Sequence, residues 1–205
     1  MTKHYYSWLA LGDSYTIGEA VALHESFPYQ ALQLLRKKGF HFHAPEIVAK
    51  TGWTTFELAE HLLHTTLNDQ YDLITLLIGV NNQYRGLSLA DYRSDLEFLL
   101  KKALHFTGNK KERVVVVSIP DWGRTPFAAE RDINSIAMEI DEYNAAKKAM
   151  CEKYEVTFID ITEAQRADSD DASFIAADKL HPSGKEYAKW AEKVAEQFEL
   201  IIYNS

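Results

Sequence analysis

The chain has 205 residues, 46% hydrophobic and 12% aromatic, which is enough apolar material for the core of one domain. No linker or repeat divides it, so we expect a single domain over residues 1–205. The net charge of -8 argues against nucleic acid and anionic lipid as partners. No apolar run reaches the ~18 residues of a membrane span, which argues against stable membrane insertion.

The single cysteine, Cys151, excludes an intrachain disulfide, and helical spacing around it predicts a core or half-buried position. The first residues show no signal-peptide pattern, so we expect a cytoplasmic protein; removal of a preceding signal peptide stays open. Small molecules are the expected partners, and the oligomeric state is undetermined.

Short apolar runs alternate with longer stretches of helical spacing along the chain. The runs predict strands over residues 6–11, 46–49, 71–78, 113–119 and 156–161. Helices are predicted over residues 26–39, 54–67, 88–106, 133–154 and 183–201. The runs LITLLIG and VVVVSIP are apolar throughout, as in strands covered on both faces. The alternation therefore predicts an α/β fold, a three-layer α/β/α sandwich with a parallel sheet at its centre.

Polar residues follow each of the first three predicted strands, and parallel sheets bind ligands beyond the carboxyl ends of their strands. These residues are Gly12-Asp13-Ser14, Thr51-Gly52-Trp53 and Gly79-Val80-Asn81-Asn82. The short segment AADKLHPSG precedes the last predicted helix and adds Asp178 and His181. We expect all four groups to meet at one edge of the sheet.

Ser14, His181 and Asp178 have the chemistry of a catalytic triad. A serine hydroxyl attacks a carbonyl well only if a base takes its proton, and a neutral imidazole suits that task. Asp178 and His181 are three residues apart, so one turn can bring carboxylate and imidazole together and orient the ring. Candidate donors to the developing oxyanion are the backbone N–H groups of Ser14 and Gly52 and the side-chain amide of Asn81.

The blocks GDSYT, TGWTT, GVNNQ and DKLHP, in this order, resemble those of the SGNH hydrolases, also called GDSL esterases and lipases. The resemblance spans nearly the whole chain. It implies functional roles for Ser14, Gly52, Asn81 and His181, with Asp178 completing the triad. It further implies a flavodoxin-like fold with a five-stranded parallel sheet, and hydrolysis of esters or thioesters without a metal or organic cofactor.

Two residues depart from the family pattern. Tyr15 stands where the family often has Leu, a change from which we expect little effect. Asn82 stands where the family usually has Asp, a change that we expect to affect local hydrogen bonding more than activity. The resemblance leaves the substrate open among lysophospholipids, acetyl esters and thioesters.

Several residues of the edge loops are candidates for a substrate pocket, with core packing as the equal alternative. They are Tyr15, Trp53, Asn82, Tyr84, Trp122 and Phe127, with Arg85 and Arg124 among them.

Plainer interpretations stay open for each block taken alone. Gly52 could supply only a positive φ, Asn81 and Asn82 could form only a turn, and His181 before Pro182 could open a helix. The rival function is a catalytically inactive protein that binds a small molecule or carbohydrate on the same fold. A nucleotide-binding module is disfavoured because no Gly-rich phosphate loop follows the first strand. The absence of a G-x-S-x-G motif disfavours an α/β-hydrolase.

No metal site is expected. His41 and His43 are predicted on one face of an extended segment, without a third ligand nearby in the sequence. His61 and His64 lack the spacing of a zinc pair and are predicted at the surface.

Overall fold

The computed structural model describes residues 4–204, so the domain predicted over residues 1–205 extends past the described range at both ends. Its centre is a sheet of five parallel strands in the order β2-β1-β3-β4-β5. The strands are β1 (Trp8–Asp13), β2 (Glu46–Lys50), β3 (Leu73–Leu77), β4 (Val114–Val117) and β5 (Thr157–Ile159). The predicted α/β fold with a five-stranded parallel sheet is confirmed.

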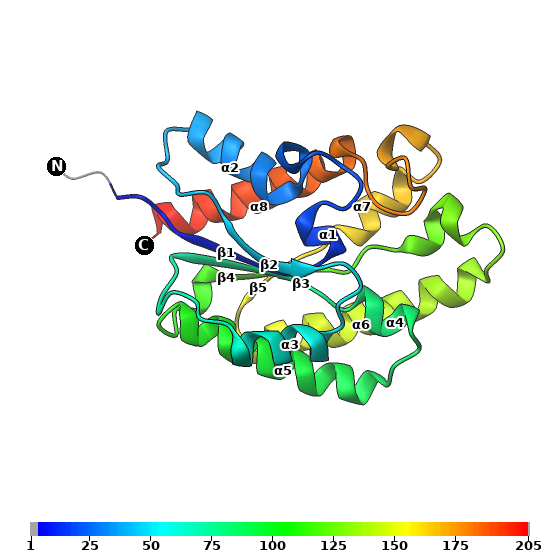
Figure 1. The fold of residues 1–205 in the computed structure, drawn as a ribbon, viewed down its shortest axis with the longest axis horizontal. Helices are drawn as coiled ribbons and strands as arrows, with labels where there is room; N and C mark the ends of the chain where they lie inside the picture. The colour runs from blue at the N-terminus through cyan, green and yellow to red at the C-terminus, as the bar shows by residue number, and fades with distance from the viewer. Residues whose placement is uncertain (1–3, 205) are drawn as a thin grey trace.

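Helices cover both faces of this sheet (Figure 1). On one face α2 (Phe27–Lys37) packs against α8 (Gly184–Tyr203). On the other face α5 (Leu89–Phe106) packs between α3 (Thr55–His64) and α6 (Ile133–Tyr154). These five are the helices predicted from the sequence.

Three shorter helices were not predicted, because four to six residues are too few to show a helical period. They are α1 (Ser14–Ile17), α4 (Val80–Tyr84) and α7 (Thr162–Ala167). The helix α1 follows β1 directly and α4 begins three residues after the end of β3, so their first residues lie at the carboxyl edge of the sheet.

The strands β3 and β4 are buried along their whole length, as their continuous apolar runs predict. Cys151 is also buried, and burial raises the pKa of its thiol to about 12. Charged side chains are buried in this core too, among them Lys147 of α6, which is fully buried and donates from Nζ to the carbonyl of Val117 at 2.8 Å. Burial lowers the pKa of Lys147 to about 7.

The chain order of the strands fixes where a ligand can bind. The chain passes from β1 outward to β2 and then returns across β1 to form β3 on its other side. The crevice at such a reversal is the usual binding site of an open α/β sheet. The elements β1, α1 and β3 approach closely there, since a Cβ on Gly12 would lie 2.0 Å from Thr16 Oγ1 and 2.4 Å from the carbonyl oxygen of Leu77.

None of the helices within residues 4–204 is long and apolar enough to cross a membrane.

Candidate active site

Ser14 is the first residue of α1, directly after β1, and its side chain is buried beneath the edge loops. Asp13 caps the helix, because its Oδ1 accepts the backbone N–H of Tyr15 at 3.0 Å. The other oxygen, Oδ2, is buried without a hydrogen-bond partner in the described part of the chain. Burial raises the pKa of Asp13 to about 7, against the lowering effects of the Tyr15 N–H and the charge of Lys147.

Asp178 makes two hydrogen bonds to His181 and a third to the neighbouring Leu180. Its Oδ2 lies 2.6 Å from Nδ1 of His181, and its Oδ1 accepts the backbone N–H groups of Leu180 and His181, each at 3.0 Å. Burial alone raises the pKa of Asp178, but these hydrogen bonds outweigh it and leave the pKa below its ordinary value. A neutral ring that donates Nδ1–H to this carboxylate keeps the lone pair of Nε2 free to accept a proton.

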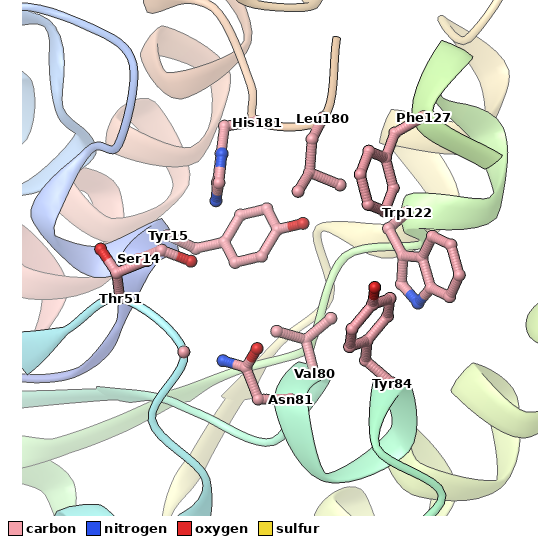
Figure 2. Close-up of a pocket in the computed structure, with 11 residues that line it drawn as sticks. Ser14, Tyr15, Thr51, Val80, Asn81, Tyr84, Trp122, Phe127, Leu180 and His181 are labelled. Carbon is pink, nitrogen blue, oxygen red and sulfur yellow. The ribbon is translucent and has the colours of Figure 1, made fainter. Parts of the chain in front are cut away.

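A backbone hydrogen bond within the loop closes the turn that carries Asp178 and His181. The N–H of Ala176 donates to the carbonyl of His181 at 2.8 Å, and Lys179 takes the left-handed conformation with φ 66°. The ring of His181 then reaches over α1, with a nitrogen at its tip pointing toward Ser14 and Tyr15 (Figure 2). Ser14 and His181 thus face one another although 166 residues separate them in the chain.

The candidate oxyanion donors flank the same space. Gly52 has φ 82°, a conformation that favours glycine, and its carbonyl accepts a hydrogen bond from Arg85. Asn81 donates from Nδ2 to the carbonyl of Trp53 at 2.9 Å. That bond fixes the amide and uses one of its two N–H groups, so the second stays available for a ligand.

A cavity of about 170 Å³ joins these residues (Figure 2). Its wall combines the predicted catalytic residues with apolar and aromatic side chains. The lining residues are Ser14, Tyr15, Thr51, Gly52, Val80, Asn81, Tyr84, Trp122, Phe127, Leu180 and His181.

The wall far from Ser14 is aromatic. The ring of Trp122 lies 5.2 Å from that of Tyr84 and 6.0 Å from that of Phe127, between centroids. The backbone N–H of Phe127 donates to the carbonyl of Lys179 at 3.0 Å, which ties this wall to the histidine loop. Four of the predicted pocket residues, Tyr15 and these three aromatics, therefore lie on the cavity wall.

Two predicted pocket residues do not lie there, and both expectations are corrected. The indole of Trp53 packs against the ring of His61, 4.7 Å between centroids, and only its carbonyl faces Asn81. Asn82 is buried on the other side of α4, where both atoms of its amide bond to Thr55. The bonds of Asn82 to Thr55 hold its amide away from the cavity, whereas Val80 and Asn81 of the same helix line it.

The two arginines of the edge loops also have other partners. Arg85 bridges the Gly52 carbonyl and the carboxylate of Glu57. Arg124 lies 3.8 Å from Asp121 and is not among the lining residues of this cavity.

Sequence reasoning did not select Thr51, Val80 and Leu180, which complete the wall. Each is next in the sequence to a predicted site residue, and this position is the feature from which the sequence could have predicted them as lining residues.

Among residues 4–204, no group of three or more His, Cys, Asp or Glu side chains could hold a metal ion. His41 and His43 both pack against the ring of Tyr5, at centroid distances of 5.3 and 5.4 Å. His61 and His64 are exposed, as predicted.

The model of the GDSL-like lipase/acylhydrolase family matches residues 10–189. No curated protein matches the chain in sequence.

Three solved structures illustrate the likeness in fold. A psychrotrophic esterase, EstA, from Pseudoalteromonas sp., in a structure inhibited by monoethylphosphonate, superposes with TM-score 0.74 at 13% identity, over 97% of this chain and 99% of that one. An acetylxylan esterase from Geobacillus stearothermophilus superposes with TM-score 0.75 at 16% identity, over 95% of this chain and 94% of that one. A lipase/acylhydrolase from Enterococcus faecalis gives 0.72 at 21% identity, over 94% of each chain.

Proposed function

This chain belongs to the GDSL-like lipase/acylhydrolase family, and from that premise we propose that it hydrolyses carboxylic esters through Ser14, His181 and Asp178. The observation that carries the proposal is the shared cavity of Ser14 and His181, with the far nitrogen of the imidazole held by Asp178 at 2.6 Å.

In the first step Ser14 Oγ attacks the carbonyl carbon of the ester while Nε2 of His181 takes the hydroxyl proton. The negative charge that develops on the carbonyl oxygen is stabilised by the N–H groups of Ser14 and Gly52 and by the second N–H of Asn81. His181 then gives its proton to the leaving alcohol, and the acyl group stays on Ser14.

In the second step water attacks the acyl group on Ser14. His181 again takes a proton, now from the water, and returns it to Ser14 Oγ as the acid leaves. Asp178 keeps its charge throughout and stabilises the imidazolium. Every proton in these steps moves between this chain, the ester and water, so turnover should continue in the presence of a chelator.

A phosphonate ester together with a substrate screen tests the proposal. The purified protein should hydrolyse p-nitrophenyl esters in chelator, and an ethyl p-nitrophenyl phosphonate should label Ser14 and abolish turnover. Ser14→Ala and His181→Ala should each remove nearly all activity, because members of a triad act as a unit. Wild-type turnover by Ser14→Ala would refute the mechanism. Binding without turnover or labelling would favour the inactive binding protein.

The same screen should compare acetylated sugars, lysophospholipids and acyl thioesters, because the proposed function leaves the choice among these substrate classes open.

A further inference from the structure

Tyr15 carries a hydroxyl on the cavity wall that the mechanism does not use. Its side chain is only 3% exposed, and its ring lies 5.0 Å from the His181 ring and 6.3 Å from the Trp190 ring, between centroids. These contacts hold the ring firmly. In Figure 2 the hydroxyl points into the cavity, on the side of the ring away from Ser14. Within residues 4–204 the hydroxyl makes no hydrogen bond to the protein.

The side chains that Figure 2 draws around this hydroxyl are mainly apolar or aromatic. Leu180 and Val80 face it from two sides, and Trp122 and Phe127 lie beyond it (Figure 2). The indole N–H of Trp122 is already donated to Gln83 Oε1 at 2.7 Å. The hydroxyl of Tyr15 is therefore a polar group in a largely apolar part of the cavity.

The hydroxyl also keeps its proton. Burial raises the pKa of Tyr15 well above the ordinary value, and the negative charges of Asp13, Asp178 and Asp121 raise it further. It is consequently a neutral group that can donate one hydrogen bond at any pH at which the triad works.

A purely alkyl group in this part of the cavity would displace water and leave the Tyr15 hydroxyl buried without a partner, which is unfavourable. A group with an oxygen at the right position would accept the hydroxyl proton instead. Sites with a buried polar group discriminate strongly against analogues that lack the matching atom.

We propose that Tyr15 is a specificity-determining residue, whose hydroxyl donates to an ether, hydroxyl or carbonyl oxygen in the part of the ester that fills the cavity. The preferred substrates are then esters with an oxygen-bearing acyl or alcohol group rather than plain alkyl esters. This proposal rests on the proposed ester hydrolysis.

Two series of isosteric esters test it. In the first, the p-nitrophenyl group is constant and an ether oxygen replaces one methylene of hexanoate at successive positions. In the second, the acetyl group is constant and hexyl acetate is compared with 2-propoxyethyl acetate and its positional isomers. We expect kcat/KM for the best ether ester to exceed that for the alkyl ester by about tenfold or more in one of the series. That series identifies whether the acyl or the alcohol group fills the cavity.

Tyr15→Phe removes only the hydroxyl oxygen and should bring that ratio to about one, with the melting temperature measured to confirm folding. Tyr187→Phe is the matched control, because its buried hydroxyl also has no partner within residues 4–204 and Tyr187 does not line the cavity; its ratio should stay at the wild-type value. Equal ratios for the wild type and Tyr15→Phe in both series would overturn the proposal, as would an equal loss of preference in Tyr187→Phe. Failure of the proposed function is distinct, since no ester of either series would then be cleaved.

Discussion

Asn82 holds Thr55 through both atoms of its side-chain amide. Its Oδ1 accepts the Thr55 backbone N–H at 2.9 Å, and its Nδ2 donates to Thr55 Oγ1 at 2.7 Å. The Thr55 hydroxyl in turn donates to Asp95 Oδ2 at 3.0 Å. Because a hydroxyl has one proton and Asp95 receives it, the neighbour at position 82 must be a donor. This relationship explains an amide where the family pattern usually has a carboxylate.

Asn82→Asp should therefore destabilise the protein by about 1–3 kcal/mol, since the Thr55 hydroxyl cannot serve two carboxylates. Turnover should stay within about tenfold of wild type, a barrier change of roughly 1.4 kcal/mol, because Asn82 faces away from the cavity. Burial already raises the pKa of Asp95, so a second carboxylate nearby is unfavourable.

The double variant Asn82→Asp/Asp95→Asn is the control for this prediction. In the wild type the side-chain hydrogen bonds run from Asn82 to Thr55 and from Thr55 to Asp95. In the double variant they can run the opposite way, so it should be more stable than Asn82→Asp alone in urea unfolding. If the double variant loses as much free energy of unfolding as the two single variants lose together, the two positions are not coupled through Thr55.

Gly52→Ala should lower both stability and kcat. At φ 82° an alanine is strained by roughly 1–2 kcal/mol, and relaxing φ turns the backbone N–H away from the oxyanion. Crowding is not the cause, since within residues 4–204 an added Cβ would meet only Arg85 Nη2, at 3.5 Å. Gly39→Ala is matched, with φ 92° and open space around it. It should lose similar stability and keep the wild-type kcat; equal kcat values for both variants would remove Gly52 from the oxyanion site.

Asn81→Ala should lower kcat by about 10²–10³ with little change in KM, because the amide donates chiefly to charge that develops in the transition state. The carbonyl of Trp53 also loses its donor, so we expect a modest fall in melting temperature. Kinetics and melting of this variant should be compared with those of Asn82→Asp. Similar small losses of kcat in both would mean that Asn81 only shapes the turn.

Asp178→Asn should lower kcat, because an amide cannot stabilise the imidazolium. Its effect on stability depends on pH. The pKa of Asp178 is lowered in the folded state, so its charge stabilises the fold above the unfolded value of about 3.9, and this contribution is lost as the pH falls through the folded value. The wild type should melt above the variant near neutral pH, and the gap should close in strong acid. A constant difference in melting temperature from about pH 6 to about pH 2 would contradict this link between the ionisation of Asp178 and stability.

The sequence by itself determined the architecture and the edge at which the site lies. Continuous apolar runs such as LITLLIG form strands wherever both faces are covered, and helical spacing predicted all five long helices. The carboxyl ends of parallel strands meet at one edge, so Ser14, Gly52 and Asn81 could be assigned to it from their places after β1, β2 and β3. These features depend on local spacing along the chain.

The tertiary structure decided which way each loop side chain points. Trp53 turns away to His61, Asn82 turns inward to Thr55, and the Tyr15 hydroxyl is left without a partner in the described part of the chain. None of these outcomes has a local signature. The direction of a side chain in a loop or a single helical turn is set by which groups from distant parts of the chain can pack against it or satisfy its hydrogen bonds.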